Sequence, residues 1–216
     1  MRDYRVEAII AGILFIAATG ATMASQMIIT PILASPDVAE YVIAHRPVFV
    51  LGIVLEIVNA LASAGIAVAF FPILWHCARI LAPAYGSLRA IEASMGVVAA
   101  IGFLLLLTPT GGAFAIEFHD AAFSLVLIVF SVSTLILYPA LFRFRLVPTI
   151  LSIWGLIGGL LLLASGLLIL LGQVDMGSTT DTILSLPIWI NEMALALWLI
   201  FRGVDLTKVR SGAEYN

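Results

Sequence analysis

Four ionisable side chains interrupt stretches of this sequence that are otherwise apolar: Glu56, Arg89, Glu92 and Glu192. A charged group at the centre of a membrane costs about 2.5–3.5 kcal/mol on insertion scales, so such residues are most often ligand-binding, proton-carrying or catalytic groups. Three carboxylates against one guanidinium leave negative charge that protons, a cation or a bound partner must neutralise. The alternative interpretation is a structural network in which paired charges only join helices.

Helical spacing groups these residues with small and polar neighbours. Glu56 shares one helix face with Asn59 and Ser63, and Arg89 lies three residues before Glu92, a spacing that allows the two to pair within one helix. Small residues let membrane helices approach closely, which turns such faces toward the interior of a bundle. The residues predicted to line an internal polar pocket for a small or lipid-like ligand or for protons are Glu56, Asn59, Arg89, Glu92, Asn191 and Glu192.

A second group of candidates lies at the start of the fourth apolar stretch, where Glu117, His119 and Asp120 follow one another closely. Imidazole and carboxylate groups are ligands of zinc and iron, so these three side chains form a candidate metal set together with Glu56 or Glu192. The alternative is that they cap the outer end of a helix at the lipid headgroups. Further along the chain, Gly155 and Gly159 form a GxxxG pattern, which predicts close helix packing.

The elements that must position these groups are membrane-spanning helices. Hydrophobic residues make up 62% of the 216 and charged residues only 11%, and the mean hydropathy is +1.17. So few charges cannot cover a water-facing surface. The whole chain, 1–216, is predicted to be a single all-α transmembrane domain, a polytopic bundle of six helices, with a short surface helix in the connection at about 32–47. The spans are expected at about 8–30, 48–73, 84–107, 119–142, 149–171 and 183–201.

The basic residues predict the orientation of the bundle. Of the ten Lys and Arg residues, only Arg46 belongs to the side that carries the acidic connections, whereas the other nine fall with the two termini. An excess of Lys and Arg marks cytoplasmic loops, so both termini are expected in the cytoplasm. The net charge of −3 excludes a basic nucleic-acid-binding surface.

Several segments of the chain resemble a large bacterial membrane family, domain-of-unknown-function family 4386. The resemblance rests on blocks that occur in the same order over nearly the whole chain: AGILF at 11–15, LEI at 55–57, RAIE at 89–92, HDAAF at 119–123, RLVP at 145–148, LSIWGLIG at 151–158, NE at 191–192 and WLI at 198–200. Members often carry a small polar residue shortly before the LVP block, where this chain has Phe144 and Arg145. The resemblance implies a multi-pass protein of a bacterial inner membrane and implies no activity.

Three functions are compatible with these patterns. The leading hypothesis is a helical bundle whose internal Glu and Arg residues bind a small or lipid-like molecule or protons. This hypothesis includes transport of the bound species across the membrane. The second is an intramembrane enzyme acting on a lipid or isoprenoid, with carboxylates as general acid and base and His119 as a proton shuttle or metal ligand. The third is an accessory subunit that binds a further copy of the chain or another membrane protein. The sequence identifies no cofactor, and the expected partner in every case is the lipid bilayer.

Overall fold

The computed structural model describes residues 4–108 and 112–206, and every regular element in these ranges is helical. Six of the helices are long and apolar enough to cross a membrane, so the chain is a multi-pass membrane protein. The helices are α1 (Arg5–Leu33), α2 (Val38–Ala44), α3 (Arg46–Cys77), α4 (Leu81–Leu105), α5 (Gly112–Arg143), α6 (Thr149–Leu170) and α7 (Thr179–Phe201).

The predicted bundle of six apolar helices is confirmed, and most of the helices extend beyond the expected spans by a few residues. The largest extension is in α5, which begins at Gly112 and therefore includes Glu117, His119 and Asp120 within the helix. The short helix expected at 32–47 is α2, whose first turn is capped by Asp37 because its carboxylate accepts a hydrogen bond of 3.1 Å from the amide of Glu40.

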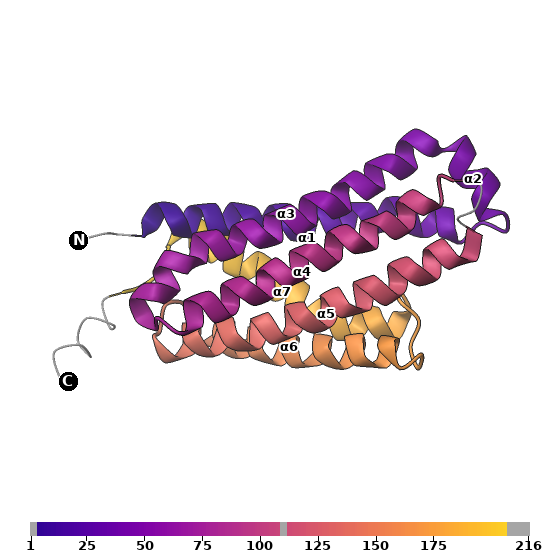
Figure 1. Cartoon of the computed structure of the whole chain (residues 1–216). Coiled ribbons are helices and arrows are strands. Elements are labelled where there is room, and N and C mark those ends of the chain that lie inside the picture. Colours follow the sequence, from indigo (N-terminus) through magenta and orange to yellow (C-terminus); the bar gives the residue numbers. More distant parts are fainter. Residues whose placement is uncertain (1–3, 109–111, 207–216) are drawn as a thin grey trace.

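The long helices form a closed ring. Each packs against the next long helix along the chain, and α7 returns to pack against α1 (Figure 1). Helix α1 begins and α7 ends at the same end of the bundle, named the terminal end here, while α2 lies at the opposite, distal end. The Arg5 guanidinium closes the ring at the terminal end, because it donates hydrogen bonds of 2.7–3.2 Å to the last carbonyls of α7, those of Leu199, Ile200 and Phe201.

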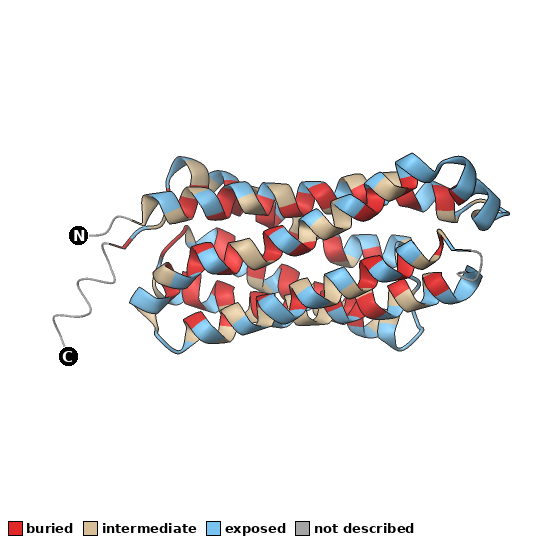
Figure 2. Ribbon diagram, turned by 45° about the horizontal axis from the view of Figure 1, so that its top comes forward, coloured by how far each residue is buried: buried red, intermediate tan, exposed pale blue. Residues whose placement is uncertain are grey.

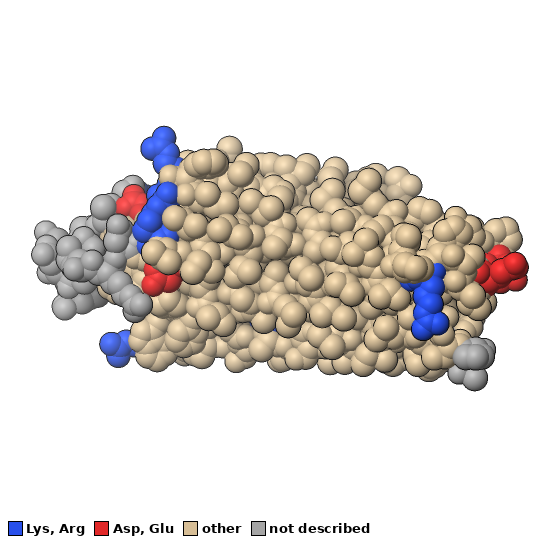
Figure 3. Space-filling view, turned by 90° about the horizontal axis from the view of Figure 1, so that it is seen from above, with Lys and Arg blue, Asp and Glu red and all other residues tan. Residues whose placement is uncertain are grey.

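The outer surface of the ring is suited to lipid. Buried residues follow the inward faces of the helices, and exposed apolar side chains lie outside (Figure 2). On the face seen in Figure 3, charged side chains gather at the two ends and leave an uncharged middle. Arg89 is one of the nine basic residues assigned to the side of the termini, but it lies inside α4 and is 2% exposed. Three more of these nine basic residues lie outside the described residues: Arg2, Lys208 and Arg210.

Glycines on α6 allow its neighbours to approach, as the GxxxG pattern predicted. A Cβ atom on Gly155 would overlap the ring of Tyr138 on α5, and one on Gly159 would come within 2.7 Å of a methyl carbon of Thr134. Gly158 faces α7 in the same way, where a Cβ atom would lie 3.0 Å from the backbone of Ile188. Helix α6 is therefore held between α5 and α7 by contacts that a larger residue would disrupt.

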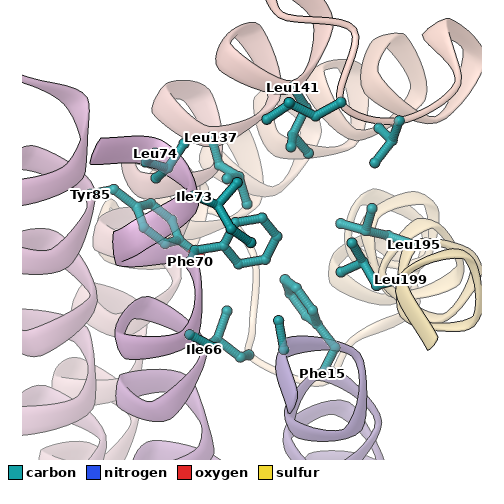
Figure 4. Packing of buried hydrophobic residues seen from close by; sticks show 14 of the residues in the cluster. Phe15, Ile66, Phe70, Ile73, Leu74, Tyr85, Leu137, Leu141, Leu195 and Leu199 are labelled. Carbon is teal, nitrogen blue, oxygen red and sulfur yellow. The ribbon is translucent and has the colours of Figure 1, made fainter. Parts of the chain in front are cut away.

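Apolar side chains fill the terminal half of the ring. Phe15, Ile66, Phe70, Leu141 and Leu199 belong to one buried cluster contributed by α1, α3, α5 and α7 (Figure 4). Phe70 packs edge-on against Phe15 and against Tyr85 of α4. The two cavities inside the ring lie beyond this cluster, in the central and distal parts of the bundle.

Candidate functional site

A central cavity lies inside the ring, next to the apolar cluster of the terminal half. Its cavity volume is about 60 Å³. Side chains from all six long helices line it: Ala18, Thr19, Thr22 and Met23 of α1, Asn59 of α3, Arg89 and Glu92 of α4, Phe123, Val126, Leu127 and Phe130 of α5, Leu162 of α6, and Trp189 and Glu192 of α7. The walls are mainly apolar, and the charges come from α4 and α7.

Arg89 and Glu92 form an ion pair within α4. Nη1 of Arg89 lies 3.0 and 3.1 Å from the two carboxylate oxygens of Glu92, and both side chains are buried. The hydroxyl of Ser63 on α3 donates to the same carboxylate, and Nε of Arg89 donates to the Ser63 carbonyl at 3.4 Å. The guanidinium also lies 5.2 Å from the ring centre of Phe130. The charges of this pair cancel, and its hydrogen bonds join α3 to α4.

Glu192 is the acidic residue of the central cavity that no ion pair neutralises among the described residues. It is only 7% exposed, and its Oε2 atom accepts a hydrogen bond of 3.0 Å from the Thr19 hydroxyl of α1. Among the described residues nothing donates a hydrogen bond to its other oxygen, Oε1. A buried carboxylate with an uncommitted acceptor is a site that a hydrogen-bond donor would stabilise.

A second, distal cavity lies between the central cavity and the distal end. Its cavity volume is about 360 Å³. Thr22, Asn59 and Phe123 line both cavities, so the two adjoin inside the ring. The other residues that line it are Ser25, Gln26, Ile29, Thr30, Leu33, Ala34, Glu56, Phe103, His119, Asp120, Met176, Gly177 and Thr182.

His119 bridges two carboxylates in the distal cavity. Its Nε2 lies 3.2 Å from Oε1 of Glu56 on α3, and its Nδ1 lies 2.9 Å from Oδ1 of Asp120. The imidazole stacks on Phe103, with ring centroids 3.6 Å apart, and on Phe123 at 5.6 Å. A neutral imidazole carries one N–H, yet both of its nitrogens face carboxylate oxygens. The arrangement therefore holds one further proton, either on the imidazole or on a carboxyl group.

The predicted metal set does not assemble. Glu117 is exposed whereas His119 is buried, because residues two apart lie on nearly opposite sides of a helix. No group of three or more His, Cys, Asp or Glu side chains is arranged to hold a metal ion within residues 4–108 and 112–206. Glu56 and Asp120 instead engage the two nitrogens of His119.

The predicted pocket residues divide between these places. Arg89, Glu92 and Glu192 meet in the central cavity, Glu56 lies in the distal cavity, and Asn59 lines both. Asn191 faces neither cavity: its amide accepts a hydrogen bond from the Tyr138 hydroxyl of α5 and donates one of 3.0 Å to the Leu151 carbonyl of α6. Asn191 thus joins α7 to α5 and α6.

Sequence reasoning missed three residues that matter here. Thr19 orients Glu192, and Trp189 lines the central cavity one helical turn away from it. Asp181 is buried at the start of α7, where its carboxylate accepts hydrogen bonds from Ser165 at 2.7 Å, Ser185 at 3.1 Å and the amide of Gly177 at 2.9 Å. The spacing of Thr19 and Thr22 on an alanine-rich face of α1 was an available signal for the first of these.

Comparison with known proteins identifies the family of this chain. A family model described as "Domain of unknown function (DUF4386)" matches residues 10–203. No curated protein and no solved structure matches the chain.

Proposed function

The chain belongs to the DUF4386 family, and we propose that it binds a small molecule that enters the helix ring from the distal end of the bundle. The observation that carries this proposal is the pair of adjoining cavities inside a closed ring, with the partly unpaired carboxylate of Glu192 at the inner one. Ligand sites typically combine apolar walls with a few convergent polar groups, and these cavities have that composition.

The direction of entry is supported by the packing. Apolar side chains fill the ring on the terminal side of the central cavity, whereas the distal cavity includes partly exposed groups such as Asp120, whose side chain is 41% exposed. The terminal end carries Arg5, Arg79, Arg143 and Arg145, which favours the cytoplasmic side of a bacterial inner membrane. The ligand would then arrive from the opposite, outer side of that membrane.

Several buried polar residues lie outside the cavities and have a structural role. Both oxygens of the Asp181 carboxylate accept hydrogen bonds, and the amide of Asn191 is bonded to α5 and α6. Glu192 differs, because one of its oxygens has no such partner among the described residues and the side chain lines a cavity. This difference favours ligand binding over a purely structural network.

The proposal is tested by equilibrium binding of three probes to the purified protein in lipid nanodiscs: benzylammonium, benzyl alcohol and benzoate. Each compound contains one benzene ring, and the three compounds differ in charge. Saturable binding of at least one of them, beyond that of empty nanodiscs, is expected. Thr22→Phe fills the junction of the two cavities with a larger side chain. It should raise the dissociation constant of that probe about tenfold or more.

Met27→Phe is the matched control, because Met27 lies on the same helix and is 78% exposed toward the lipid. It should bind the probe as the unaltered protein does. If none of the three probes binds saturably, or if Thr22→Phe binds as tightly as the control variant, the proposed function is refuted.

A further inference from the structure

The adjoining cavities contain more negative than positive groups. Arg89 is the only Lys or Arg among their lining residues, against the four carboxylates of Glu56, Glu92, Asp120 and Glu192. Arg89 is committed to Glu92 at 3.0 Å. Because the His119 arrangement holds one further proton, the excess is two negative charges when the other acidic groups are ionised. Such an excess inside a low-dielectric bundle favours a positively charged partner and repels an anion.

Two carboxylate oxygens in these cavities lack a donor. Oε1 of Glu192 receives no hydrogen bond from the described residues, and Oε2 of Glu56 is buried without a partner among them. An ammonium group donates up to three hydrogen bonds and accepts none, whereas a hydroxyl donates one and a carboxylate donates none. Hydrogen bonds from a charged donor to a carboxylate are also stronger than neutral ones. A group rich in donors and positively charged is therefore the best match to these acceptors.

The walls around Glu192 specify the rest of the ligand. Trp189 lies one turn before Glu192 on α7, and Phe123 and Phe130 line the same cavity from α5. Aromatic faces attract cations, as the position of the Arg89 guanidinium over Phe130 illustrates. Leu127 and Leu162 complete an apolar surface that a hydrocarbon body would bury.

We propose that the ligand is a small organic ammonium compound with an apolar body, bound with its ammonium group at Glu192 and its body against the aromatic walls. This inference rests on the proposed function and adds to it the chemistry of the ligand. It assigns Glu192 as the anchoring residue, Glu56 as the carboxylate that attracts the cation in the distal cavity, and the Arg89–Glu92 pair as an internally neutral part of the wall.

The test compares the affinities of the three probes at one pH and one salt concentration, with empty nanodiscs subtracted. Benzylammonium should bind at least about tenfold more tightly than benzyl alcohol, and benzoate should bind most weakly. Glu192→Gln, which keeps the shape and removes the charge, should weaken benzylammonium about 10- to 100-fold, the range expected for a hydrogen bond to a charged group, and should change benzyl alcohol less than about threefold.

Glu117→Gln is the matched control, because it removes the same charge from an exposed position on α5. It should leave all three affinities unchanged. Glu56→Gln is the second variant and keeps the test decisive if Glu192→Gln does not fold: it should weaken benzylammonium and spare benzyl alcohol.

Benzyl alcohol binding as tightly as benzylammonium would refute the charge selection while leaving the ligand-binding function intact, since protons alone would then neutralise the carboxylates. An equal loss of benzylammonium binding in Glu117→Gln and in Glu192→Gln would overturn the assignment of Glu192. Absence of binding by all three probes would refute the proposed function itself, so the two failures are distinguishable.

Discussion

Replacing one member of the Arg89–Glu92 pair should destabilise the protein far more than replacing both. Nη1 of Arg89 contacts both oxygens of Glu92 at 3.0–3.1 Å, and the two residues are 2% and 6% exposed. Removing one partner leaves a buried, unpaired charge, which costs about 3–5 kcal/mol, whereas replacing a buried pair with apolar residues of similar volume is often neutral or stabilising.

The variants are Arg89→Met, Glu92→Leu and the double variant. Each single change should lower the free energy of unfolding by about 3–5 kcal/mol, and the double variant should recover about 3 kcal/mol or more of the summed loss. The assay is reversible unfolding in mixed micelles of a mild detergent and dodecyl sulfate, followed by helical circular dichroism. Additive losses in the double variant, or single variants within about 1 kcal/mol of the unaltered protein, would refute the pairing.

Three further outcomes follow from the packing and the topology. Gly155→Ala should lower the free energy of unfolding by about 1–3 kcal/mol, because its Cβ would overlap the Tyr138 ring. Gly20→Ala, whose Cβ would meet no neighbour, should be neutral or stabilising. Equal effects of the two substitutions in the same micelle assay would contradict this contact. Asp181→Ala should speed amide hydrogen exchange at Gly177 and in the first turn of α7, since the hydrogen bonds from Ser165 and Gly177 are lost, and unchanged exchange would count against this role. In a Cys77→Ala background, Ser35→Cys at the distal end should react with an impermeant maleimide added to intact bacterial cells and Arg145→Cys should not; the reverse labelling would invert the proposed orientation.

Much of the fold follows from hydropathy alone. Apolar stretches long enough to cross a membrane located all six long helices, and the helix-start signal before Val38 located α2. The i, i+3 spacing of Arg89 and Glu92 predicted their pairing, and the structure confirms it at 3.0 Å. These features depend on local sequence, which is why the sequence is sufficient to predict them.

The division of the polar residues between two cavities could not be predicted in the same way. The sequence predicts one pocket for Glu56 and Glu92, but it does not fix the depth at which each helix crosses the bundle or the direction in which a side chain points within the ring. Adjacent residues differ by about 100° around a helix. Asn191 therefore faces Tyr138 and Leu151 while Glu192 faces the central cavity, although the two are neighbours in sequence.

Helix rotation also explains why Glu117 lies apart from His119, and position along α4 explains why Arg89 does not belong to a connection. Glu117 and His119 differ by about 200° around α5, so only one of them can point into the ring. Arg89 lies eight residues after Leu81, the first residue of α4, and it is buried. Its charge is neutralised inside the ring by Glu92.

The proposed ligand is an organic ammonium ion that binds inside the helix ring beside Glu192. The most direct measurement is a crystal structure of the protein with 4-bromobenzylammonium, in which anomalous scattering locates the bromine. We predict a bromine peak inside the ring, among Phe123, Trp189 and the other side chains that line the central cavity, with the ammonium group within hydrogen-bond distance of Glu192. Bromine peaks only on the lipid-facing surface, with none inside the ring at saturating concentration, would contradict the claim.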